Sequence, residues 1–100
     1  MDNNKKTRIV NRYPVETETR EFVSANILEV EVGTTGYCGG DTGHGCRTYF
    51  RLKDLSSTDI EVYFSEDEGL EIELGGDCEL DTFIDCLEFA IAKLKEQRKG

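Results

Sequence analysis

Hydrophobic and polar residues alternate along four segments in the middle of the chain. Every second side chain in these segments is apolar, which is the pattern of a β-strand with one buried face. The four segments cover residues 28–32, 47–53, 60–64 and 70–74. Short polar turns join the last three segments, so we predict an antiparallel meander.

A different period begins after the glycine pair at residues 75–76. Apolar residues now recur at steps of three and four, which predicts an amphipathic α-helix. They are Leu80, Phe83, Ile84, Leu87, Ile91 and Leu94. Asp77 is predicted to be the N-cap of this helix. Basic residues at its far end, among them Lys95 and Arg98, complement the helix dipole.

The sheet and the helix each have one apolar face, and each face can be buried by packing against the other. We therefore predict an α+β fold: a four-stranded antiparallel meander with one C-terminal helix packed on one face, as a two-layer sandwich. A fifth strand forms if Ile9 and Val10 pair along a sheet edge. The predicted sheet core is Leu28, Val30, Val32, Phe50, Leu52, Ile60, Val62, Phe64, Leu70, Ile72 and Leu74.

One hundred residues suffice for a single domain. Four of the first twelve residues are basic and one is acidic, so residues 1–12 are predicted to be a flexible basic arm and residues 13–100 the domain. No apolar run resembles a signal peptide or a membrane span, so we expect a cytoplasmic protein with no membrane contact.

The chain carries 21 acidic and 12 basic residues, a net charge of −9. Such a surface repels phosphate backbones, so direct nucleic-acid binding is not expected. On the polar face of the predicted sheet, the first strand carries Glu29 and Glu31, the second Arg47, Arg51 and Lys53, and the third Asp59 and Glu61. We predict that the basic second strand forms a ladder of opposite charges with the acidic strands on both sides of it.

A glycine-rich loop at residues 33–47 is the most unusual segment, with six of the ten glycines and the only histidine. Hairpin loops usually run about two to five residues, so a longer one is typical of a functional loop. Backbone amides and cations in this pattern favour recognition of an anion. The candidate ligand-binding residues are Gly39, Gly40, Asp41, His44, Arg47, Tyr49 and Arg51.

Metal binding is an alternative for the same loop. Cys38, Asp41, His44 and Cys46 are all residue types that ligate zinc, and one ion would staple the loop. Thiol chemistry would then be available. A third interpretation is a mobile loop that binds nothing, with Cys38 and Cys46 close together at its neck.

Nucleophilic catalysis by a loop cysteine is not expected, because a catalytic cysteine and histidine are usually distant in sequence and supported by a third orienting group, and so small a meander offers no evident cleft. Cys78 and Cys86 fall on the predicted helix, where packing is their expected role. The sequence thus favours a small, acidic, non-enzymatic binding or regulatory module that uses loop 33–47 to contact a protein or a small anionic ligand. A further alternative is an acidic decoy of the phage or mobile-element type, which would occupy the site of a nucleic-acid-binding protein.

Overall fold

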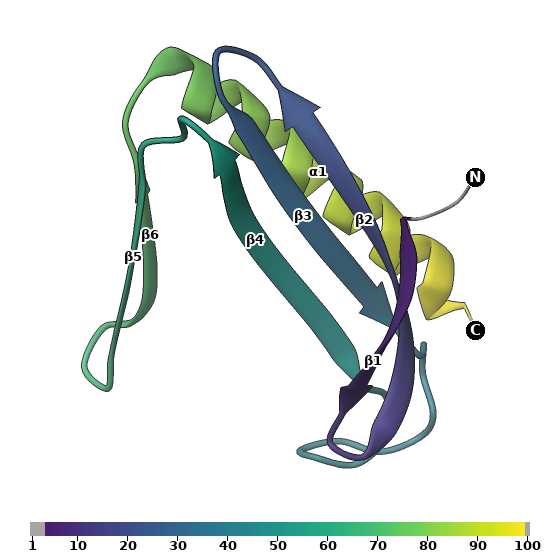
Figure 1. Cartoon of the computed structure of the whole chain (residues 1–100). Helices are drawn as coiled ribbons and strands as arrows, with labels where there is room; N and C mark the ends of the chain where they lie inside the picture. Colours follow the sequence, from purple (N-terminus) through teal and green to yellow (C-terminus); the bar gives the residue numbers. More distant parts are fainter. Residues whose placement is uncertain (1–3, 100) are drawn as a thin grey trace.

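A curved four-stranded antiparallel sheet carries one helix on one face, and a separate two-stranded hairpin lies beside it (Figure 1). The computed structural model describes residues 4–99. The elements are β1 (Lys5–Val10), β2 (Tyr13–Val23), β3 (Ile27–Thr34), β4 (Thr48–Ser56), β5 (Ile60–Ser65), β6 (Gly69–Leu74) and α1 (Asp77–Arg98). The sheet order is β1-β2-β3-β4, and β5 pairs with β6. The predicted α+β class, with an antiparallel sheet and a C-terminal helix on one face, is confirmed.

The first two strands are longer than the sequence pattern indicates. Residues 5–10, assigned to the basic arm, form β1 and pair with β2 from Lys5↔Glu18 to Val10↔Tyr13. Asn11 and Arg12 have positive φ angles of 48° and 75°, as the two-residue turn of a β-hairpin requires.

Proline is tolerated in β2 because of where its neighbours pair. Pro14 lies opposite Ile9 of β1, whereas β3 pairs with β2 only from Glu18 onward. The missing N–H of Pro14 therefore falls where β2 has one neighbouring strand instead of two.

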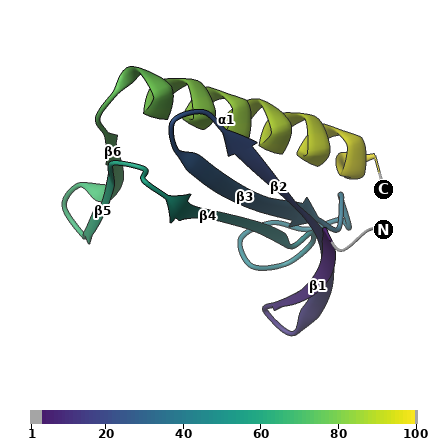
Figure 2. The ribbon, with the colours of Figure 1, turned by 45° about the horizontal axis from the view of Figure 1, so that its top comes forward.

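The core lies between β3 and α1, and the helix also packs on β2 (Figure 2). Leu28, Val30 and Val32 are fully buried and face Cys86 and Ala90 of the helix. Partly buried residues surround this centre: Phe22, Leu52, Ile60, Phe83, Phe89 and Leu94. The predicted alternation in residues 28–32 is confirmed here.

The predicted core is wrong for the outer part of the hairpin formed by β5 and β6, although Ile60 at the start of β5 packs against the core. Val62, Phe64 and Leu70 are 60%, 76% and 65% exposed. The reason is that β5 and β6 pair only with each other, so their apolar face is not carried under the helix. Alternation specifies which side chains share a face, but it does not specify which sheet a strand joins.

A buried hydrogen-bond network fixes the base of the hairpin. The Asn26 side-chain amide donates to the hydroxyl of Thr58 at 2.9 Å and to that of Thr82 at 3.0 Å. The Thr58 hydroxyl donates onward to the Ile27 carbonyl at 3.2 Å. One asparagine thus ties the start of the hairpin to the β2–β3 turn and to α1.

The start of the helix differs from the prediction. Gly76, with φ of 124°, is the N-cap, and Asp77 is the first helical residue, with no side-chain capping hydrogen bond. The carboxylate of Glu79 in the first turn instead accepts the backbone N–H of Asp59 at 3.1 Å. The first turn is therefore joined to the hairpin base. Within residues 4–99, no helix combines the length and the hydropathy that crossing a membrane requires.

The far end of the helix is fastened to the sheet by polar contacts. Gln97 accepts the backbone N–H of Thr34 at 3.1 Å and donates to the Glu16 carbonyl at 3.1 Å. Lys93 forms an ion pair with Glu18 at 2.7 Å, which lowers the pKa of that carboxyl. These contacts hold α1 over the end of β3, where the glycine-rich loop begins.

Candidate functional site

Threonines close the neck of the glycine-rich loop. The backbone N–H of Thr35 donates to the Arg47 carbonyl at 3.0 Å, and the N–H of Arg47 donates to the Thr35 hydroxyl at 3.0 Å. Thr34 and Thr48 join their hydroxyls at 2.9 Å across the ends of β3 and β4. The loop at residues 35–47 therefore leaves and re-enters the sheet at a closed neck.

Inside the loop, the chain folds back on itself. A Cβ atom at Gly45 would lie 2.6 Å from the carbonyl oxygen of Gly40, and Gly45 has a φ of +92°. The N–H of His44 donates to the Asp41 carbonyl at 3.1 Å, which closes the turn between these glycines. Only glycine fits the contact at position 45, because both the space and the φ angle exclude a side chain.

The loop and the β1–β2 turn lie at the same end of the molecule (Figure 1), and together they line a pocket of about 310 Å³. Its lining residues are Tyr13, Pro14, Thr35, Cys38, His44, Gly45 and Arg47. His44, Arg47 and Cys38 were candidates from the sequence. Tyr13 and Pro14 were not, since only the β1–β2 register brings them to the loop.

Arg47 is held firmly in the wall of this pocket. Its guanidinium carbon lies 4.6 Å from the centre of the Tyr13 ring, within the range of a cation–π contact. Its Nη1 donates to the Gly45 carbonyl at 2.7 Å. The Nε atom is buried and has no hydrogen-bond partner within residues 4–99.

The other candidate residues lie elsewhere. Gly39, Gly40 and Asp41 line a second depression of about 280 Å³, together with Cys38 and Cys46. Two further candidates belong to the sheet. The guanidinium carbon of Arg8 lies over the Tyr49 ring, 5.0 Å from its centre. Arg51 forms ion pairs with Glu29 and Glu31 of β3. The structure thus unites only part of the predicted ligand-binding set.

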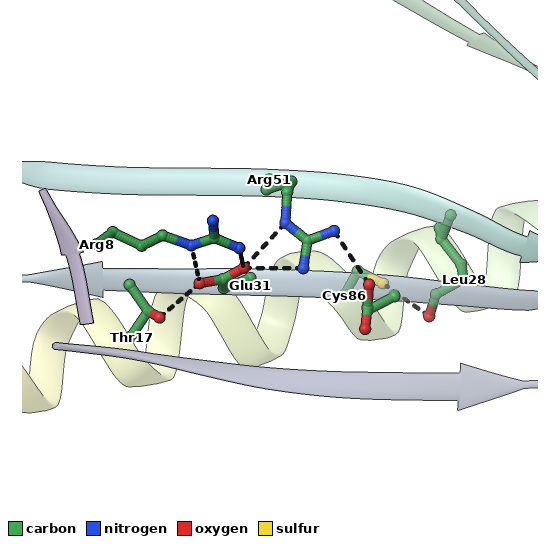
Figure 3. Close-up of polar contacts among 7 residues, drawn as sticks. Arg8, Thr17, Leu28, Glu31, Arg51 and Cys86 are labelled. Carbon is green, nitrogen blue, oxygen red and sulfur yellow. Dashed lines mark hydrogen bonds and ion pairs between the residues drawn. The ribbon is translucent and has the colours of Figure 1, made fainter. Parts of the chain in front are cut away.

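A fully buried carboxylate on the polar side of the sheet gathers one residue from each strand (Figure 3). Glu31 of β3 accepts hydrogen bonds from Arg8 of β1 at 2.5 and 2.7 Å and from the Thr17 hydroxyl of β2 at 2.6 Å. Arg51 of β4 contacts it at 2.8 and 2.9 Å and reaches Glu29 at 3.0 Å. We call Arg8, Thr17, Glu31 and Arg51 the Glu31 cluster.

The Glu31 cluster explains part of the charge pattern. The hydrogen bonds from Arg8, and then those from Thr17 and Arg51, hold the pKa of Glu31 at about 2. In the β3–β4 register Glu31 lies opposite Arg51, and Glu29 lies opposite Lys53, so the predicted alignment of opposite charges is confirmed for these two strands. Arg51 therefore already pairs with Glu29 and Glu31 of β3. The prediction is wrong for Asp59 and Glu61, because β5 pairs with β6 and not with β4.

Metal ligation receives no geometric support from the side chains. Within residues 4–99, no three histidine, cysteine, aspartate or glutamate side chains are placed to share one metal ion. Cys38 and His44 line one pocket, whereas Asp41 and Cys46 line the other. Zinc binding at these four residues stays a prediction, since ligation would need the loop to rearrange.

The helix cysteines have structural surroundings. Cys86 is fully buried, and its thiol lies 3.8 Å from the Leu28 carbonyl oxygen (Figure 3). Burial raises the pKa of this thiol to about 12, so it stays protonated and packs as a small apolar group. Cys78 is half-buried near the helix start.

No protein-family model, curated protein or solved structure matches this chain.

Gly33 sets how closely β2 approaches the start of the loop. A Cβ at this position would lie 2.8 Å from the Thr17 Cα and would overlap the Glu16 carbonyl oxygen. Both obstacles are backbone, so Gly33→Ala is expected to lower the free energy of unfolding by about 3 kcal/mol, as measured by urea denaturation. Gly39→Ala is the control, because that position is in open space and only its positive φ is strained, at a cost of about 1 kcal/mol. Equal losses in the two variants would contradict the close approach.

Proposed function

We propose that this protein is a non-enzymatic binding module that holds the anionic group of a small ligand, a carboxylate or a phosphate, in the pocket between the glycine-rich loop and Tyr13. One observation carries the proposal. In a chain with a net charge of −9, this pocket is lined by Arg47 and His44, and none of its described lining residues is a carboxylate.

Arg47 is suited to this role because its guanidinium is already positioned. Stacking on Tyr13 and the hydrogen bond to the Gly45 carbonyl restrict its rotamers before a ligand arrives. A preorganised guanidinium loses less conformational entropy on binding, and it forms strong, charge-assisted hydrogen bonds to oxyanions. Tyr13 and Pro14 provide an apolar wall for the remainder of the ligand.

The test is a titration of the protein with inorganic phosphate and with phenyl phosphate, followed by NMR of the backbone amides. We expect saturable shifts at Thr35, Gly45 and Arg47, with tighter binding of the phenyl ester because of the Tyr13 wall. Arg47→Gln is expected to weaken binding about tenfold or more, since it removes a charged hydrogen-bond donor.

Two further variants serve as controls. Lys95→Gln removes an exposed cation from the helix and should leave the affinity unchanged. Cys38→Ser should also retain binding, whereas a zinc-dependent site would lose it. Shifts spread over the surface, or equal affinities of Arg47→Gln and Lys95→Gln, would refute the pocket as the binding site.

A further inference from the structure

A row of large apolar side chains lies on the outer side of α1. The buried residues of the helix, which face the sheet, are Thr82, Cys86 and Ala90. A helix turns about 100° per residue, so the row is displaced by about 100 to 160° around the helix from Cys86. Its members, each between 37% and 55% exposed, are Leu80, Ile84, Leu87 and Ile91. We call these four residues the outer stripe.

The outer stripe has the spacing of a helix that packs against another helix. Its members follow one another at steps of four, three and four residues, as the a and d positions of a heptad do. Figure 2 shows α1 as a layer of its own, with the strands on its other side. A second helix can therefore approach along the whole length of the stripe.

The charges beside the outer stripe favour a second copy of the same helix as the partner. Asp77 and Asp81 lie near the start of α1, and Lys95 and Lys99 lie at its end. By the helical period, all four flank the stripe on the side away from the sheet. They are exposed, and none of them forms an ion pair with a residue in 4–99.

These charges also select the direction of the partner helix. In an antiparallel pair, the acidic start of each helix lies beside the basic end of the other, and the two helix dipoles oppose each other. In a parallel pair, Asp81 would face Asp81 and Lys95 would face Lys95. The charge pattern of α1 is therefore complementary to itself only in the antiparallel arrangement.

We propose that α1 is a dimerisation helix, and that two copies of this chain pack their outer stripes together, antiparallel, about a two-fold axis. The axis passes between Ile84 and Leu87, so Ile84 of each copy packs against Leu87 of the other. Both copies then use the same surface, as a closed two-fold dimer requires. The exposed apolar area of α1 is buried without any change in the sheet or the hairpin.

The dimer does not depend on the proposed anion pocket, because none of the described residues that line the pocket belongs to α1. Lys95→Gln should therefore weaken the dimer and leave phosphate binding unchanged. The two proposals can thus fail separately.

Sedimentation equilibrium of the full chain at micromolar concentration tests the dimer. We expect a particle of twice the chain mass, and we expect Ile84→Ser to raise the dissociation constant about tenfold or more, since it removes an apolar anchor at the centre of the interface. The matched control is Val62→Ser, which removes an exposed apolar side chain from the hairpin and should leave the constant unchanged. A monomeric wild-type chain, or equal effects of the two variants, would overturn the proposal.

Charge reversal tests the antiparallel arrangement. Asp81 and Lys95 are separated by about 21 Å along the helix, so they cannot meet within one chain. At low salt, Asp81→Lys and Lys95→Glu should each raise the dissociation constant about tenfold, because two contacts in the dimer change from attractive to repulsive.

Mixing the two charge variants should restore dimers at concentrations where each variant alone is monomeric. In the heterodimer, Lys at position 81 of one copy faces Glu at position 95 of the other, and the second contact keeps the original Asp81 and Lys95. No gain on mixing would rule out the antiparallel pair. Circular dichroism of each variant checks that the helix is retained.

Discussion

Replacing Glu31 by glutamine is expected to cost about 3 kcal/mol of unfolding free energy, a large share of the stability of a domain this size. The change keeps the shape of the side chain but removes its charge. Arg8 and Arg51 would then face a neutral amide beneath the sheet. Their side chains are 33% and 24% exposed, so water relieves part of the cost, and the loss stays near the low end of the range for broken buried ion pairs.

Glu29→Gln is the matched control, because Glu29 is half-buried and receives only one contact from Arg51. We expect it to cost less than about 1 kcal/mol. Urea denaturation at neutral pH measures both variants. Equal losses would mean that the Glu31 cluster does not stabilise the sheet.

The same carboxylate makes a prediction about acid. The folded-state pKa of Glu31 is about 2, below the 4.5 of an unperturbed glutamate. A carboxyl with a lowered folded-state pKa contributes stability above the unfolded value and loses it as pH falls toward the folded value. The wild type should therefore lose stability between about pH 4.5 and pH 2, and Glu31→Gln should lose less over the same interval. Parallel curves would contradict the assigned pKa.

Leu28→Ala is expected to have the other large effect, about 3 kcal/mol, because it leaves a cavity in the fully buried centre under α1. Leu70→Ala removes the same atoms from the exposed face of the hairpin and should cost less than about 1 kcal/mol. Thermal or urea denaturation of both variants compares the two losses. If Leu70→Ala were as costly as Leu28→Ala, the hairpin would belong to the main core after all.

The spacing of apolar residues is sufficient to predict that β3, β4, β5, β6 and α1 form, because each has one apolar face. It assigns the wrong face of α1 to the core, since the buried helix residues are Thr82, Cys86 and Ala90, whereas most of the predicted stripe is exposed: Leu80, Ile84, Leu87 and Ile91.

The same spacing does not predict β2, where Glu18 and Arg20 lie opposite the buried Val32 and Val30 and break the apolar pattern on the side that faces the helix. The separation of the hairpin is also hidden from local pattern. It depends on Asn26 meeting Thr58 and Thr82, which lie 32 and 56 positions further along the chain.

The candidate site was predictable to a similar degree. A long loop with many glycines points to His44 and Arg47, and the structure places both in one pocket. Tyr13, on which Arg47 stacks, is the first residue of β2, and its place beside the loop depends on the pairing of β1 with β2. From the sequence, Arg51 is a cation that could bind a ligand. In the structure, the β3–β4 register places it beside Glu31 and Glu29, and it forms ion pairs with both.

Because the Glu31 cluster takes one side chain from each of the four strands, it makes the outermost strand β1 part of a single cooperative unit. Edge strands commonly open in local fluctuations well below the global unfolding free energy. Here β1 cannot detach without withdrawing Arg8 from a carboxylate that is buried beneath the sheet. Fraying of β1 is therefore coupled to the opening of the whole sheet. Although β1 is short and polar and buries little apolar area, the free energy of opening it should approach that of the strands beside it.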